Sequence, residues 1–149
     1  MLKEKINDFL SYLETVKQLS NHTTNSYRRD LNKFSDFLSD SAIDTWQEVR
    51  ESEVRSYINK ERRRGLNPRS IQRILSSCRS FFNYLLQERI IDKSPAENIS
   101  SPKSSSLLPK AMDADLVQRL LDFKPNGMFE VRDKAIAELL YSSGLRLSE

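Results

Sequence analysis

The chain has 149 residues, of which 38% are hydrophobic and 30% are charged, and its formal net charge is +3. This length suffices for one ordinary domain or two small ones, and no apolar run is long enough for a transmembrane helix. A single cysteine, Cys78, and a single histidine, His22, exclude a disulfide framework and a Cys-rich or His-rich metal site. The N-terminal residues mix acids and lysines with apolar side chains, so we expect no secretory signal, no membrane association and a cytoplasmic location.

The positive charge is concentrated in one segment. Between Lys60 and Arg79 there are seven basic side chains and one acidic side chain, Glu61. A local excess of this kind is typical of a surface that neutralises phosphate groups. A solvated helix face that binds nothing has the same composition, so charge alone does not separate the two interpretations.

Apolar residues recur at helical spacing nearly throughout the chain, and this periodicity predicts an all-α fold. The first helix has an apolar face formed by Leu2, Ile6, Phe9, Leu10, Leu13 and Val16. The second helix follows the polar residues 20–24, several of which are suited to cap it. The third spans about Glu51 to Arg63 and stops at Gly65. The fourth has Asn67 as its cap and Pro68 as its first residue.

The second and fourth predicted helices each have an apolar face and a separate polar, basic face. Five arginines on the polar faces are our candidate DNA contacts: Arg28, Arg29, Arg69, Arg73 and Arg79. Four further side chains near the helix starts are suited to phosphate oxygens: Thr23, Thr24, Asn25 and Ser70. Each arginine is equally compatible with a solvated position or with an ion pair along its own helix.

The composition changes after residue 90. Residues 91–110 contain six serines and three of the five prolines, which predicts a linker. Two more helices are predicted at 113–123 and at about 129–142. Their expected inward-facing residues are Leu116, Leu120 and Leu121, and Ile136, Leu139 and Leu140. Residues 111–149 are too few for a stable domain of their own.

Four stretches of the sequence carry a resemblance to a known family. They are KQLSNHTTNSYRRDLNKF, RRRGLNPRSIQRILSSCRSFFNYL, SPAENISSPKSSSLLPKAMD and VRDKAIAELLYSSGLRLSE. Together they resemble the tyrosine (integrase-type) site-specific recombinases, and within that family the bacterial members that resolve chromosome dimers at cell division. The most specific match is the segment from Ser143 to Glu149, which resembles the first arginine motif of the family.

The resemblance implies a fold, a reaction and partners. The fold would be an N-terminal SAM-like core-binding domain of four or five helices at residues 1–90, a linker at 91–110 and the first helices of a catalytic domain at 111–149. The reaction would cut and rejoin double-stranded DNA through a 3′-phosphotyrosyl intermediate, with no metal and no other cofactor. The implied partner is a sister recombinase, with which such proteins form a tetramer on DNA.

The same resemblance assigns Arg146 as a catalytic arginine and Glu149 as its acidic supporting neighbour. A guanidinium suits this role because it stays ionised and donates parallel hydrogen bonds to the charge that develops on a phosphate. The second arginine, the His-x-x-Arg motif and the nucleophilic tyrosine of the family have no counterpart in these 149 residues. Tyr141 precedes the arginine motif and is not the nucleophile. We therefore expect this chain to be inactive alone.

Two functions of other classes remain compatible with the residues. One is a helical DNA-binding regulator without catalysis. The other is a helical protein–protein adaptor that uses the apolar ends of residues 129–149.

Overall fold

The structure is a computed structural model that describes residues 2–101, 112–144 and 146. These residues form six α-helices and one short 3-10 helix and contain no strand, so the all-α prediction is confirmed. The chain divides into two compact units, Met1–Ser105 and Ser106–Glu149. Within the described ranges, no helix is both long enough and apolar enough to cross a membrane.

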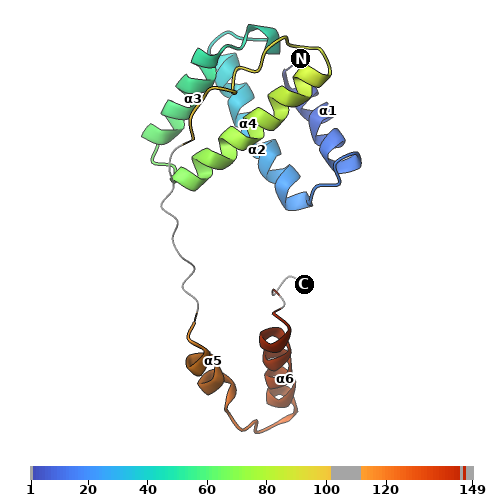
Figure 1. Cartoon of the computed structure of the whole chain (residues 1–149), viewed down its shortest axis with the longest axis vertical. Coiled ribbons are helices and arrows are strands. Elements are labelled where there is room, and N and C mark those ends of the chain that lie inside the picture. The colour runs from blue at the N-terminus through green and yellow to red at the C-terminus, as the bar shows by residue number, and fades with distance from the viewer. Residues whose placement is uncertain (1, 102–111, 145, 147–149) are drawn as a thin grey trace. The chain divides into compact units, whose positions relative to one another are not determined.

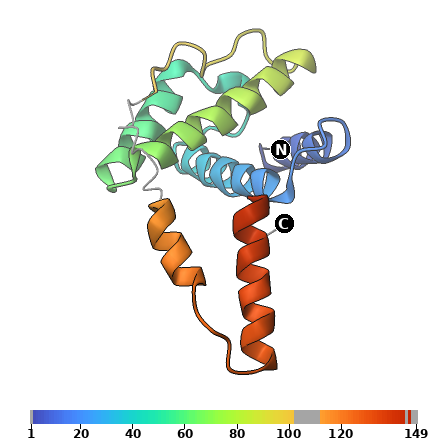
Figure 2. The ribbon, with the colours of Figure 1, turned by 60° about the horizontal axis from the view of Figure 1, so that its bottom comes forward.

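Four α-helices build the first unit (Figure 1). They are α1 (Leu2–Thr15), α2 (Asn21–Asp40), α3 (Glu51–Arg63) and α4 (Pro68–Gln87), with the 3-10 helix η1 (Trp46–Glu48) between α2 and α3. Helices α2 and α4 are the central pair, because each packs against the other three helices of the unit. Figure 2 shows α4 crossing α2 on one side of the bundle.

Two helices of this unit, α2 and α4, begin directly after predicted capping residues. Ser20 is the N-cap of α2 and its hydroxyl accepts a hydrogen bond from the backbone N–H of Thr23. Asn67 is the N-cap of α4 and its side chain accepts from the backbone N–H of Arg69, one residue after Pro68. Between α3 and α4 the chain turns at Gly65, whose φ of +82° is a left-handed conformation that glycine adopts without strain.

Aromatic rings fill the centre of the first unit. The ring of Phe34 lies 5.0 Å from that of Tyr57 and 6.3 Å from that of Phe82, measured between centroids. The ring of Trp46 lies 4.6 Å from that of Phe81, and its indole N–H donates to the carbonyl oxygen of Leu2 at 3.2 Å. Trp46 therefore fastens η1 to α1 and α4 and also contacts α2 through Phe34.

Val16 and the segment after α4 differ from the sequence predictions. Val16 lies beyond the end of α1 and is 65% exposed, so its place on the apolar face was wrongly predicted. The segment that follows α4 packs against the first unit, with Ile91, Ala96 and Ile99 buried. A Ser- and Pro-rich composition excludes regular helix and strand, but a few apolar side chains still anchor such a segment to a core. Residues 102–110 of the predicted linker lie outside the described residues.

The second unit contains α5 (Ala114–Leu121) and α6 (Met128–Ser143), and neither helix has a buried residue. Four side chains predicted to face inward are at least half exposed: Leu116, Leu120, Ile136 and Leu139. The prediction that they lie inside is wrong for this chain. Two helices alone supply no further layer to cover their apolar faces, although the periodicity still marks those faces correctly.

We expect the substitution Phe34→Ala to lower the free energy of unfolding by about 3–5 kcal/mol, because it leaves a cavity among the aromatic rings. Val16→Ala is the matched control and should change that free energy by less than about 0.5 kcal/mol, since Val16 is exposed. Urea denaturation followed by circular dichroism measures both variants. Equal stability of the two variants would show that Phe34 is not central to the core.

Candidate nucleic-acid interface

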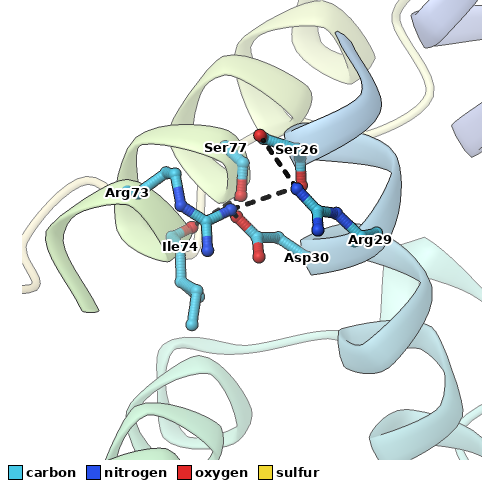
Figure 3. A network of polar contacts seen from close by, with 6 residues as sticks. All are labelled: Ser26, Arg29, Asp30, Arg73, Ile74 and Ser77. Atoms are coloured by element: carbon cyan, nitrogen blue, oxygen red, sulfur yellow. Dashed lines mark hydrogen bonds and ion pairs between the residues drawn. The ribbon is translucent and has the colours of Figure 1, made fainter. Parts of the chain in front are cut away.

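The polar faces of α2 and α4 meet where the two helices cross (Figure 3). From α4, Nη1 of Arg73 donates to the carbonyl oxygen of Ser26 at 3.4 Å and to the carboxylate of Asp30, both on α2. On α2 itself, Nη2 of Arg29 donates to the hydroxyl of Ser26 at 3.4 Å. Two of the predicted DNA-contacting arginines, Arg29 and Arg73, thus both bond to Ser26. Arg29 is three positions from Ser26 in the sequence, whereas Arg73 is 47 positions from Ser26 and 43 from Asp30.

The ion pair at this crossing joins a buried acid to a half-exposed base. The side chain of Asp30 is 6% exposed and that of Arg73 is 41% exposed. Burial raises the pKa of the Asp30 carboxyl above its usual value, because the charged form loses its water. The hydrogen bond and charge of Arg73 oppose this effect, as do the charges of Lys33 and Arg29. An ionised Asp30 therefore depends on Arg73 for compensation.

Arg28 and Arg69 lie on the same two helices in more open positions. Nη2 of Arg28 lies 3.5 Å from the Glu14 carboxylate of α1, and both side chains are about half exposed. Arg69 is exposed, one turn before Arg73 on α4, and its guanidinium has no hydrogen bond or ion pair to the described part of the chain. Exposed pairs such as that of Arg28 are weak, so both guanidinium groups are accessible to a phosphate.

The side chains near the helix starts divide into accessible and buried ones. Asn25 is exposed, and Thr23 and Ser70 are partly exposed. Thr24 is buried, and its hydroxyl donates to the carbonyl oxygen of Asn21 at 3.2 Å. The structure thus gives Thr24 a partner inside α2 and turns its side chain away from solvent.

Arg79 has three partners within the chain. Its Nε donates to the carbonyl oxygen of Ala96 at 3.2 Å, and its Nη2 donates to that of Ile99. Its Nη1 lies 3.5 Å from the hydroxyl of Ser101. The guanidinium therefore holds the segment after α4 against the helix, a role that its place on the polar face of α4 did not reveal.

The two residues of the arginine motif are in the second unit. Arg146 is exposed and follows Gly144, which ends α6 with a left-handed φ of +65°. Glu149, its predicted supporting neighbour, lies outside the described residues.

Cys78 is completely buried, and burial raises the pKa of its thiol to about 12. The thiol is therefore protonated at neutral pH and is part of the apolar core. Among the described residues, no three His, Cys, Asp or Glu side chains gather closely enough to hold a metal ion.

Sequence analysis missed Asp30 and Ser26. Asp30 follows Tyr27 by three residues and precedes Phe34 by four, so helical spacing places it beside the apolar face of α2. A carboxylate beside an apolar face needs a charged or hydrogen-bonding partner, so this spacing could have indicated that Asp30 is paired. Ser26 carried no signal, because its contribution includes a backbone carbonyl.

Comparison with known proteins supplies a second line of evidence. The family described as "Phage integrase, N-terminal SAM-like domain" matches residues 6–89. The tyrosine recombinase XerC of Xanthomonas campestris pv. campestris is 40% identical over 144 residues, which are 97% of this chain and 45% of that protein. The XerC of Actinobacillus pleuropneumoniae serotype 7 is 42% identical over 95% of this chain and 46% of that protein. The XerC of Escherichia coli O157:H7 is 38% identical over 99% of this chain and 50% of that protein. The chain spans about half the length of these curated relatives.

We expect Arg73→Ala to lower the free energy of unfolding at pH 7 by about 1–2 kcal/mol. Breaking a fully buried ion pair costs about 3–5 kcal/mol, and the exposure of Arg73 reduces that cost. Without Arg73, the pKa of Asp30 rises further above its ordinary 3.8. A carboxyl whose pKa is raised on folding contributes stability below its unfolded pKa and loses that contribution as pH rises through its folded pKa. The stability difference from the unmodified chain should therefore shrink from pH 7 towards pH 4.

Urea denaturation at several pH values measures this difference. The control is the double variant Asp30→Asn/Arg73→Ala, in which the titrating group is gone and the difference should not depend on pH in this way. A stability difference for Arg73→Ala that is the same at pH 7 and pH 4 would contradict the dependence of Asp30 on Arg73.

Proposed function

We propose a function from two observations: the chain belongs to the phage integrase N-terminal SAM-like domain family, and its α2 and α4 present arginines side by side on one surface. The function is the binding of duplex DNA through α2 and α4, as part of a XerC-like tyrosine recombinase. The observation that carries it is the crossing of α2 and α4, where Arg29 and Arg73 from different helices meet at Ser26.

The division of each helix into two faces supports this proposal. The apolar faces of α2 and α4 pack in the core, where Leu31, Phe34, Phe81 and Phe82 are buried. Arg28, Arg29, Arg69 and Arg73 are exposed on the faces that remain for a ligand, whereas Arg79 holds the segment after α4. An α-helix fits the major groove of B-DNA, and guanidinium groups along it reach phosphates or the edge of guanine.

We assign the DNA contacts to the accessible members of the predicted set, which are Thr23, Asn25, Arg28, Arg29, Arg69, Ser70 and Arg73. Thr24 and Arg79, also predicted as contacts, have partners inside the chain. We propose that these two contribute to DNA binding only by holding α2 and the segment after α4 in place.

The reaction of the complete recombinase is a further part of the proposal. Arg146 would stabilise the charge that develops on the scissile phosphate, with Glu149 in support. A tyrosine of the complete recombinase would attack that phosphate and break its bond to the 5′-oxygen, which leaves as a 5′-hydroxyl, so that a 3′-phosphotyrosyl intermediate forms without metal or other cofactor. Resolution of chromosome dimers in the cytoplasm, in a tetramer with a XerD-like sister recombinase, would be the biological setting. The resemblance of residues 144–149 to the arginine motif supports these roles.

We expect Arg69→Ala to weaken duplex binding by about 1–2 kcal/mol and to make its salt dependence shallower by about one unit of slope, because one phosphate contact is lost. The matched control is Arg55→Ala, which removes the same charge from α3, where Arg55 pairs with Glu51. Fluorescence anisotropy with a labelled duplex at several salt concentrations measures both. Phosphate contacts do not depend on sequence, so an arbitrary duplex suffices.

Equal affinities of the Arg69 and Arg55 variants would contradict the assignment of the surface to α2 and α4. The absence of any duplex binding by the unmodified chain would instead favour the adaptor alternative, which uses apolar side chains within residues 129–149, such as the exposed Phe129, Ile136 and Leu139 of α6.

We expect the chain to form no covalent complex with DNA, because its sequence offers no counterpart of the nucleophilic tyrosine. A duplex with a nick beside the scissile position traps a phosphotyrosyl product, which runs as a shifted band on a denaturing gel. A shifted band that disappears in Tyr141→Phe would show that the nucleophile was misassigned.

A further inference from the structure

We propose that Asp30 is a positioning residue that holds the guanidinium of Arg73 in the orientation in which it meets a DNA phosphate. This inference rests on the proposed function. It concerns a residue that does not itself touch DNA, because the side chain of Asp30 is almost fully buried between α2 and α4.

The geometry of Arg73 is that of an anchored donor. Its contacts to Asp30 and to the carbonyl oxygen of Ser26 both use Nη1. A guanidinium has five N–H donors in one rigid plane, so fixing Nη1 from two sides also fixes the direction of Nε and Nη2. These remain for a ligand on the exposed side of a group that is 41% exposed.

The anchor also lowers the entropic cost of binding. A free arginine side chain has many rotamers, and a phosphate that binds it must select one of them. Arg73 is already held across two helices, whereas Arg69 on the preceding turn of α4 has no such anchor within the described residues. The ion pairs of Arg28 and Arg55 differ as well, because their acids are 43% and 41% exposed, against 6% for Asp30, and hold them only weakly.

Net charge alone and the positioning role predict opposite changes of duplex affinity when Asp30 is neutralised. An acid beside a DNA-binding surface repels phosphates, so its removal should strengthen binding if charge alone matters. If Asp30 positions Arg73, its neutralisation should weaken binding in spite of the gain in net charge.

The experiment compares Asp30→Asn with Asp36→Asn. Asp36 is on the same helix, pairs with Lys3 and is exposed, so its variant makes the same change of charge without an anchored arginine. Anisotropy titrations with a duplex should show Asp36→Asn binding as tightly as the unmodified chain or more tightly. Asp30→Asn should bind about 2- to 10-fold more weakly, the range expected for coupled neighbours. Circular dichroism checks that both variants are folded.

A double-mutant cycle with Arg73→Lys separates positioning from a general structural effect. Lysine keeps the charge but lacks the planar fork, so Arg73→Lys alone should also bind 2- to 10-fold more weakly. In that background Asp30→Asn should cause no further loss, because the group it positions is gone. If Asp30→Asn does not fold, Arg73→Lys alone still tests whether the planar guanidinium of Arg73, and not only its charge, is needed for tight binding.

The outcomes separate this inference from the proposed function. If the unmodified chain binds duplex with the expected salt dependence and Asp30→Asn binds as tightly as Asp36→Asn, the positioning role is overturned and the DNA-binding function stands. An equal loss from Asp30→Asn in both backgrounds would also overturn it. If the unmodified chain binds no duplex, the proposed function fails, and this inference fails with it.

Discussion

The ion pair between Asp30 and Arg73 is the interaction on which the arrangement of the interface depends. It connects the two central helices of the first unit, α2 and α4, at the point where their basic faces meet. A buried carboxylate is costly unless it has a charged, hydrogen-bonded partner, so α2 and α4 are more stable in this register when Arg73 faces Asp30. The same requirement keeps a guanidinium at the surface between them. Stability and the placement of a DNA contact therefore have one physical origin here.

The aromatic core makes this placement rigid. Phe34 of α2 and Phe82 of α4 contact each other, and Trp46 packs on both. Rings of this size leave few alternative packings, so α2 and α4 cannot slide past each other without opening a cavity. Arginines on the outer faces are thereby held at set positions by residues that never contact DNA. In each helix, the packing of the apolar face consequently fixes the position of the arginines on the basic face.

The sequence predicted the helices and their faces well and predicted the pairing of individual side chains poorly. Caps such as Ser20 and Asn67 act within four residues, so local chemistry was enough to find them. Arg79 and Arg73 share a helix and a residue type, yet one holds the segment at 96–99 and the other reaches Asp30. Those partners lie 17 and 43 positions away, and nothing local to either arginine encodes them. The burial of Ile91, Ala96 and Ile99 was not predicted either, because a Ser- and Pro-rich segment shows no apolar periodicity.

The two units differ in how completely local pattern becomes tertiary structure. In the first unit, four amphipathic helices cover one another and the predicted apolar faces are buried, apart from Val16. In the second, α5 and α6 have equally clear apolar residues, but Leu120 and Leu139 are exposed because two helices cannot enclose a core. Periodicity thus identifies which face of a helix is suited to burial, and the number of neighbouring elements decides whether burial occurs.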